Sequence, residues 1–442
     1  MTIQGSTWAA LLKGITVLAG VIPVAGMAQV TETPPAPPAP PASAELKPEE
    51  ATTLKILPPQ PQWAYVRGGF GFGGTRIFDG TTGKMRGEID NSNRGDVALD
   101  PAGKFYYVAD TIWTKNDRGM RQDFVAIYDT TELKLQTEIP IPGRIIVGGF
   151  TKNLILSDDG KTAFVYNYDP ASSVNVVDLE KRKFVRAIEL PGCASLISNP
   201  GVGFSALCSD GTIATVDTAG SKPKITHGAP FFQASADPIF SNFVYDKLKK
   251  QATFISYSGL VYQATMGAAP NVSSPFSLQE AAGVPRGETK PLVVNWLPGG
   301  TQLMALHRPS GHLYVLMHKG EFWTQKEGGE EIWDVDLATR KVVKRRPLKT
   351  PVGNIEVTQD ATPLLFVNDK EGTTYVLDAK TMEEKRKIEK TGQGLIMVAD
   401  VGTPAMGASS GGATPTPASL TSSGATPPSI TAAPTPTGST DH

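Results

Sequence analysis

The chain lacks the features that mark several large classes of protein. It has two cysteines in 442 residues, a formal net charge of −1 and 40% hydrophobic residues. A charge so close to zero leaves no basic footprint for nucleic acid. No apolar run reaches the roughly 20 residues that a comfortable transmembrane helix needs. The composition therefore predicts a globular protein with polar appendages, and disfavours nucleic-acid-binding and membrane-embedded proteins.

Short motifs of self-contained enzymes are missing as well. The sequence has no G-x-S-x-G elbow, no H-E-x-x-H zinc motif and no EF-hand loop. The glycine-rich stretch Gly68–Gly74 lacks the lysine of a nucleotide-binding loop and leads into strand-like residues instead of a helix. We interpret it as an inter-strand loop that displays Phe70 and Phe72; a blade connection with both rings buried is the alternative. We expect no catalytic centre in this chain alone.

What is present begins with an export pattern. Lys13 precedes the apolar run Gly14–Ala25, and Gly26-Met27-Ala28 has the small-x-small form of a signal-peptidase site. We predict a signal peptide over residues 1–28 and a periplasmic protein without a membrane span after cleavage. An uncleaved membrane anchor is the alternative.

Low-complexity segments flank the body on both sides. Residues 29–53 are rich in proline and alanine, which favours an extended tether. Residues 403–442 are rich in Ala, Gly, Ser, Thr and Pro, and offer too little apolar surface to offset the entropy of ordering. The sequence predicts disorder in both segments and a folded body over residues 54–402.

The two cysteines fit an exported protein. Cys193 and Cys208 lie on two strand-like runs that flank an Asn199-Pro200-Gly201 turn, so they can face each other on adjacent strands. In an oxidising compartment a disulfide is the expected state. A metal pair or a redox dithiol is the alternative, but there is no C-x-x-C motif and the nearest histidine in sequence is His227.

A repeat organises the body. Seven times, an apolar strand ends near a polar marker residue, passes through a short turn and continues as a second strand, at a mean spacing of about 50 residues. The markers are Asp79, Asp129, Asp178, Asp217, Gln263 in a degenerate copy, Asp336 and Asp378. Each repeat supplies about four strands that cannot bury both faces alone, and radial stacking solves that problem. We predict an all-β fold, a seven-bladed β-propeller of four-stranded antiparallel blades. A β-solenoid is the alternative, although its rungs would be far shorter.

Three of the five histidines lie in one β-meander, Trp296–Leu348. His307, His312 and His318 have no obvious carboxylate partner in the sequence, and hydrogen-bonded structural histidines are a better interpretation than a metal site. We therefore predict no metal. The nearby acids are interpreted as a solvated loop: Glu327, Glu330 and Glu331.

Landmarks spread over the body carry a resemblance to a known family. They are Asp110-Thr111 with the long turn to Gly119, Arg121-Gln122-Asp123-Phe124-Val125, Leu156–Thr162, the Cys193–Cys208 hairpin, Trp296–Gly300, His307-Arg308, Leu313–Met317, Val357–Asp360 and Pro363-Leu364-Leu365. In their order and spacing, roughly residues 60–402 resemble the heavy, or large, subunit of the quinoprotein amine dehydrogenases, the methylamine and aromatic amine dehydrogenase family.

The resemblance implies a non-catalytic scaffold within an enzyme. The family's heavy subunit is a periplasmic seven-bladed propeller in an α₂β₂ heterotetramer with a small cysteine-rich light subunit. That partner carries the tryptophan tryptophylquinone cofactor, oxidises a primary amine to an aldehyde and ammonia, and passes electrons to a blue-copper protein or a cytochrome c. The resemblance implies no cofactor bound by this chain alone.

The resemblance also implies one site in this chain. In the family, a phenylalanine after the first propeller strand lines the channel through which the amine reaches the quinone. Phe70 and Phe72 are the candidates, because they follow the strand-like run Tyr65-Val66-Arg67. The family's run there is longer and carries Asp-Pro and His, where this chain has glycines.

Two other functions stay open at this point. The glycine-rich replacement and the low-complexity ends are compatible with an exported propeller that binds or scaffolds without amine dehydrogenase activity. An independent propeller enzyme, such as a lactonase or a quinone-cofactor dehydrogenase, is disfavoured because no cluster of Asp, Glu and His has metal-ligand spacing.

Overall fold

Strands make up nearly all of the regular structure. The computed structural model describes residues 55–69, 71–115, 118–146 and 149–400, all within the unit Thr53–His442. The predicted signal peptide 1–28, linker 29–53 and tail 403–442 lie outside the described residues, and so does Phe70. The one described helix, α1 (Leu278–Ala281), is four residues long. In the described part, no helix has the length and apolar character needed to cross a membrane.

Four sheets have four antiparallel strands each. The first is ordered β29-β1-β2-β3: β29 Ile396–Val398, β1 Trp63–Arg67, β2 Thr75–Asp79 and β3 Met85–Ile89. The second is ordered β4-β5-β6-β7: Asp96–Leu99, Phe105–Lys115, Arg118–Asp129 and Leu135–Pro140. The third runs from β8 to β11: Leu154–Leu156, Thr162–Asn167, Ser173–Asp178 and Lys183–Glu189. The fourth runs from β12 to β15: Cys193–Asn199, Gly203–Cys208, Ile213–Asp217 and Lys224–His227.

The two remaining sheets are larger. The fifth has β16 Val244–Asp246, β17 Gln251–Ile255, β18 Leu260–Thr265, β19 Asn271–Val272 and β20 Phe276–Ser277. The sixth has eight strands: β21 Asn295–Pro298, β22 Met304–His307, β23 His312–Gly320, β24 Gly329–Asp336, β25 Lys341–Val357, β26 Leu364–Asp369, β27 Thr374–Asp378 and β28 Glu384–Ile388.

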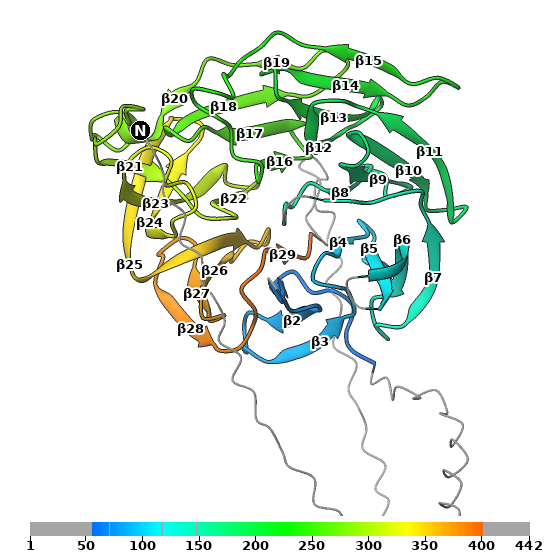
Figure 1. Cartoon of the computed structure of the whole chain (residues 1–442). Helices are drawn as coiled ribbons and strands as arrows, with labels where there is room; N and C mark the ends of the chain where they lie inside the picture. The colour runs from blue at the N-terminus through cyan, green and yellow to red at the C-terminus, as the bar shows by residue number, and fades with distance from the viewer. Residues whose placement is uncertain (1–54, 70, 116–117, 147–148, 401–442) are drawn as a thin grey trace, which may run out of the picture. The chain divides into compact units, whose positions relative to one another are not determined.

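The sheets form a ring around a central space, which confirms the propeller (Figure 1). The last strand, β29, pairs with β1 and so joins the end of the described chain to its first sheet. The prediction of seven separate blades is wrong, because hydrogen bonds define five separate blades and one continuous eight-stranded sheet. The reason is β25, a 17-residue strand that pairs with β24 through its first part and with β26 through its last part. No turn interrupts the ladder there.

The repeat markers are turn-forming residues. Each marker aspartate is the last residue of its strand, as Asp79 is of β2 and Asp378 is of β27. Asp378 Oδ1 accepts hydrogen bonds from the backbone N–H groups of Lys380 and Thr381, both at 3.0 Å. An aspartate that bonds the backbone two and three residues ahead fixes a tight turn. This local chemistry explains why the spacing of the markers predicted the strands correctly.

The hydrophobic core lies between neighbouring sheets. Alternation along β1 sends Trp63 and Tyr65 toward the sheet of β4 to β7, while Ala64 and Val66 pack against β26 and β27. One such cluster lies at each contact between neighbouring sheets. Every sheet therefore buries both faces, which leaves the inner and outer edges of the ring for function.

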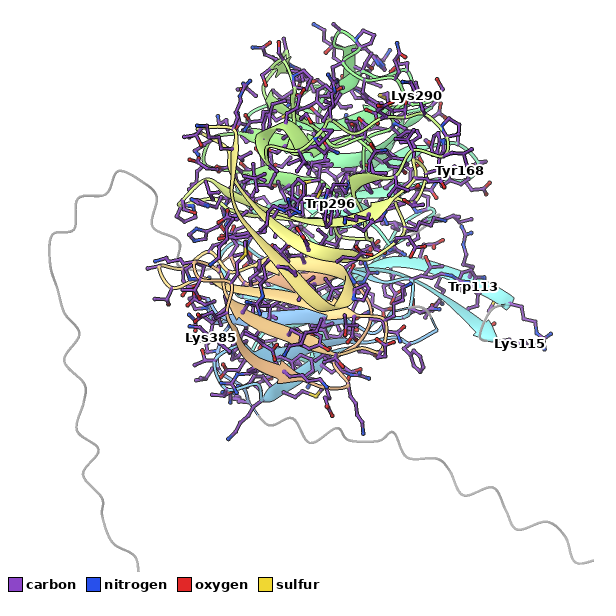
Figure 2. All side chains as sticks on the ribbon, turned by 90° about the vertical axis from the view of Figure 1, so that its left-hand side faces the viewer. Trp113, Lys115, Tyr168, Lys290, Trp296 and Lys385 are labelled. Carbon is purple, nitrogen blue, oxygen red and sulfur yellow. A yellow bond between two sulfur atoms is a disulfide. The ribbon has the colours of Figure 1, made fainter. Side chains whose placement is uncertain are left out.

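One hairpin extends beyond the sheet that carries it. Figure 2 shows Trp113 and Lys115 on the β5–β6 hairpin, projecting from the rest of the ring. The ring of Trp113 lies under the guanidinium of Arg94, 4.7 Å from its centroid. The long turn predicted between Asp110 and Gly119 is therefore a continuation of two paired strands.

Candidate functional site

The innermost strands of the ring enclose a cavity of about 340 Å³, here called the inner chamber. Its wall includes residues of β29, β4, β8, β12 and β16, together with Arg308 just after β22 and Glu356 on β25. Strands from all six sheets thus contribute to one space, and residues distant in the sequence meet there. Such a space is the usual position of a ligand site in a closed ring of sheets.

A second cavity of about 400 Å³ is here called the mouth. It is lined by loop residues that precede or follow the inner strands, including Gly68, Gly69, Phe72, Ser92 and Gln393. Arg67 and Leu395 line both cavities, so the mouth and the inner chamber are neighbours. The predicted channel residue Phe72 therefore lines the mouth, and 65% of its surface is exposed.

The glycine-rich loop connects β1 to β2, as predicted. Gly68 N–H donates to Gly74 O at 2.9 Å, which closes the loop at its base. A Cβ on Gly68 would lie 2.5 Å from Gly73 O, and Gly74 has a φ of +82°. Residues with side chains would not fit this backbone. The glycines therefore permit the backbone conformation in which Phe72 is exposed, and the alternative of a buried Phe72 is excluded.

Charged side chains gather in the inner chamber. The carboxylate of Asp400 pairs with Arg308 and, at 2.5 Å, with Lys247. Lys152 lines the same chamber, and its ammonium lies 5.4 Å from the centroid of the Phe243 ring. Among the described residues no carboxylate pairs with Lys152, and burial lowers the pKa of its ammonium. Sequence reasoning did not assign any of these residues to a site.

Glu356 faces this group of cations. Its Oε1 accepts from the N–H of Val357 and its Oε2 from the Gln302 side chain, both at 3.0 Å. Burial raises the pKa of its carboxyl to about 7, even though both hydrogen bonds and the cations Lys152 and Arg308 favour the charged form. Glu356 therefore changes its charge near neutral pH.

A second ion-pair cluster stands between the chamber and the mouth. Asp96 pairs with Arg67 at 2.9 Å and with Arg144, whose side chain is fully buried. Arg144 also donates to the backbone oxygen of Arg94 at 2.7 Å. Removing one partner from such a buried pair is costly, since the other charge is left without compensation. This cluster fixes the position of Arg67, which lines both cavities.

The predicted disulfide is present. Cys193 and Cys208 are directly paired residues of β12 and β13, and their sulfurs are bonded at 2.08 Å. Asp210 and His227 lie near Cys208 in a group that could hold a metal ion. The bonded sulfur is not a thiolate ligand, however, and Nδ1 of His227 is 3.1 Å from the hydroxyl of Thr212. The metal and redox alternatives for the cysteines therefore have no support.

The three clustered histidines do not converge on one point. His307 bonds Ser310 and the backbone oxygen of Asp360, while His318 bonds Thr324 at 2.8 Å. Burial lowers the pKa of both imidazoles. His312 does have a carboxylate partner, in contrast to the sequence-based interpretation: its Nδ1 is 2.6 Å from Asp334 on the neighbouring strand β24. The two residues are 22 positions apart in the sequence, and the pairing of β23 with β24 brings them together.

Of the three acidic residues predicted on a solvated loop, Glu327 is exposed outside the strands as predicted, and the other two differ. Glu330 and Glu331 belong to β24, and Glu331 accepts from Trp333 Nε1 at 2.7 Å and from Arg345 Nε at 2.8 Å. The guanidinium of Arg345 lies over the rings of both Trp333 and Trp296. Glu331 therefore holds a cation against a pair of indoles, which is a structural role.

Comparisons with known proteins identify the family. The family profile of the methylamine dehydrogenase heavy chain (MADH) matches residues 69–401. The chain belongs to the methylamine dehydrogenase heavy chain family. This confirms the resemblance that the sequence landmarks indicated.

Individual relatives agree with the family match. The chain is 30% identical over 326 residues to the methylamine dehydrogenase heavy chain of Methylobacillus flagellatus, covering 72% of this chain and 78% of the relative. It is 28% identical over 400 residues to that of Methylophilus methylotrophus, covering 88% and 96%. Among solved structures, dihydro-heme d1 dehydrogenase NirN aligns with a TM-score of 0.51 at 18% identity, over 81% of this chain and 83% of that chain. The last likeness shows the fold alone.

Proposed function

We propose that this chain is the non-catalytic heavy subunit of a periplasmic amine dehydrogenase. In this proposal it forms an α₂β₂ assembly with a small cysteine-rich subunit that carries tryptophan tryptophylquinone. The assembly oxidises a primary amine to an aldehyde and ammonia and passes electrons to a blue-copper protein or a cytochrome c. Support comes from family membership over residues 69–401, since the relatives are named as heavy chains of one such enzyme.

The mouth is the part of this chain that we assign to the amine. The observation that carries this assignment is Phe72: it lines a cavity at the end of the ring and exposes 65% of its surface. The exposed ring offers apolar surface that a partner chain could cover. A partner placed against this loop would enclose the mouth, and the Phe72 ring would then form part of the entrance that the substituent of the amine contacts.

The pair of described tryptophans in ring contact does not fit a quinone cofactor. Trp296 and Trp333 are in ring contact, with centroids 5.7 Å apart, as a cofactor formed from two indoles would require. Trp333 is fully buried, however, and Arg345 covers both rings. No amine would reach a reactive carbonyl at that position. This arrangement supports a cofactor in the partner chain, and we assign no catalytic residue to the present one.

Co-purification tests the proposal directly. The full chain is isolated under native conditions from the organism that encodes it, and its partners, visible absorbance and methylamine-dependent dye reduction are measured. We expect a small cysteine-rich chain, a quinone absorbance and dye reduction in the same fractions. A chain that elutes as a monomer without a quinone-bearing partner would contradict the proposal and favour a propeller that only binds or scaffolds.

A further inference from the structure

The most exposed apolar side chains gather at the end of the ring that carries the mouth. In the described part of the chain the four most exposed large apolar residues are Leu292, at 84%, Met120, at 72%, and Phe72 and Val294, both at 65%. Phe72 lines the mouth itself. The other three lie on two segments that extend from the same end, and the proposed function gives them no role.

The β5–β6 hairpin is the first of these segments. Asp96, the first residue of β4, pairs with Ala109, so β5 continues past the start of β4 as far as Lys115. The loop residues just before β4 line the mouth. The hairpin therefore extends from the mouth end of the ring, and Figure 2 shows it projecting there. It exposes the apolar side chains of Ile112 and Met120.

The second segment is here called the tryptophan patch and consists of Leu292, Val294 and Trp323. Leu292 and Val294 come just before β21, whose first residue pairs with the last residue of β23. Trp323 lies on the loop that follows β23, and two later residues of this loop line the mouth, Lys326 and Gly328. The patch is therefore at the same end of the ring as the mouth and the hairpin. Neighbouring exposed apolar side chains mark interaction surfaces, whereas single ones need no explanation.

Contacts within the chain hold both halves of the patch. The backbone N–H of Leu292 donates to Oε2 of Glu321 at 3.2 Å, which joins the segment before β21 to the loop after β23. The ring of Trp323 packs edge-on against Tyr257, with centroids 5.9 Å apart, while more than half of its surface stays exposed. The exposed apolar surface is thus presented by packed and hydrogen-bonded residues.

The backbone of the patch has an uncommon conformation. Leu292 has a φ of +64° and Trp323 a φ of +78°. Five other described non-glycine residues with positive φ share one position in a repeated turn, four residues after an aspartate that ends a strand: Leu133, Arg182, Lys250, Arg340 and Met382. Leu292 and Trp323 belong to no such turn. A bulky side chain at positive φ costs free energy, and strain of this kind concentrates at functional sites.

We propose that the hairpin and the tryptophan patch, together with Phe72, form the surface on which the light subunit of the proposed assembly docks. The inference rests on the proposed function and adds to it two contacts outside the mouth. The sheet that carries Phe72 packs against the sheets of both segments, so the three form one arc along the ring. This continuity ties the occupant of the surface to the partner assigned to the mouth.

The charge of the hairpin indicates the chemistry of the partner face. Residues 112–122 hold three cations, Lys115, Arg118 and Arg121, against one carboxylate, Asp117, which lies outside the described residues. Arg121 pairs with a buried aspartate at 2.8 Å, and the other two cations have no ion-pair partner in the described part of the chain. Since complementary charges fix the register of docking, we expect carboxylates beside apolar side chains on the partner. Trp, Met and Arg, which this surface presents, are enriched in protein interfaces.

Hydroxyl-radical footprinting tests this surface without any substitution. Exposed methionine is oxidised readily, and the oxidation of Met120 and Trp323 is compared between the assembled enzyme and the full chain alone. Met85, an exposed methionine that begins β3 at the far end from the glycine-rich loop, is the internal control. We expect oxidation of Met120 and Trp323 to fall several-fold on assembly, and oxidation of Met85 to stay constant.

Matched variants measure the contribution of each segment. Met120→Glu and Leu292→Glu each place a carboxylate where an apolar side chain would be covered, and each is expected to raise the Kd of the light subunit about 10-fold or more. Met85→Glu makes the same change at the other end and should leave the Kd unchanged. All three side chains are exposed, so the melting temperatures should stay close to that of the wild type. A wild-type Kd in both Met120→Glu and Leu292→Glu would overturn the proposal.

The outcomes distinguish this inference from the proposed function. A native chain that co-purifies with no small quinone-bearing chain would overturn both. A bound light subunit that leaves Met120 and Trp323 as reactive as in the free chain would overturn only the docking surface. Protection of these two residues in a dimer of the chain, without a small partner, would overturn the choice of occupant.

Discussion

The mouth and the inner chamber are neighbouring cavities of one ring, but their walls are built from different chemistry. Loop glycines, uncharged polar side chains and the exposed ring of Phe72 form much of the mouth. The chamber wall sets five carboxylates against four cations: Asp96, Asp100, Asp158, Glu356 and Asp400 against Arg67, Lys152, Lys247 and Arg308. The mouth presents an exposed aromatic ring that a partner could cover, whereas the chamber holds a dense group of opposite charges. One ring thus holds two neighbouring cavities of different chemistry.

The largest expected effect concerns the scaffold beneath the chamber. The strand β12, which contributes Leu196 and Ser198 to the chamber wall, is tied to β13 by the Cys193–Cys208 bond. Replacing both cysteines by alanine should lower the free energy of unfolding by about 3 kcal/mol, because the closed loop restricts the unfolded chain. Denaturant unfolding measures this loss. The amine KM of the assembled enzyme should not change, and a changed KM would mean that the mouth depends on this hairpin.

The next effect concerns the ionisation of Glu356 in the chamber wall and its influence on stability. The carboxyl of Glu356 has a pKa of about 7 in the folded chain, against about 4.3 in an unfolded one. The folded state therefore holds the proton more tightly, and stability falls as the pH rises from about 4 to 7. Relative to Glu356→Gln, the wild type should lose about 1–3 kcal/mol over this range. Denaturant unfolding at pH 5 and pH 8 measures the difference; parallel changes in both proteins would place Glu356 in a solvent-like environment.

A smaller effect is expected at a turn remote from both cavities. Asp378 bonds the N–H groups of Lys380 and Thr381, and Asp378→Ala should cost about 1 kcal/mol, as loss of a capping side chain does. The hydrogen bond from Thr381 and the contact with Lys385 lower the pKa of this carboxyl. Its contribution is therefore present above about pH 4, the unfolded value, and is lost as the pH falls further.

Thermal unfolding of the wild type and Asp378→Ala at pH 7 and pH 3 measures this contribution. The two melting temperatures should differ at pH 7, and the difference should be smaller at pH 3. A difference that persists undiminished at pH 3 would show that the side chain acts through packing instead of its charge.

Local chemistry explains what could be read from the sequence. The marker aspartates fix turns through hydrogen bonds to residues two or three positions ahead. The strand ends at Asp79 and Asp378 can therefore be predicted from the local sequence alone. The pairing of Cys193 with Cys208 follows from one hairpin in the same way. The exposure of Phe72 follows from the glycines around it. Each of these features depends on neighbours along the chain.

Features that depend on ring closure could not be read in this way. Lys152, Arg308 and Glu356 come from three different parts of the chain and meet only because the inner strands share one axis. A weak signal existed for Glu356, since it is a charged residue between the apolar residues Ile355 and Val357 of β25. The continuity of β25 was not predicted because Pro347, Pro351 and Gly353 lie within it, and such residues usually mark a break between strands.

The division of roles between the two cavities rests most directly on Phe72. The decisive measurement is the methylamine KM of the assembled enzyme carrying Phe72→Ala, with Val185→Ala as a control for an exposed apolar residue on the outer strand β11. Phe72→Ala is expected to raise KM several-fold while stability changes by less than about 0.5 kcal/mol, because the ring is exposed. Val185→Ala should change neither quantity. An unchanged KM in an intact Phe72→Ala assembly would contradict the assignment of the mouth to the amine.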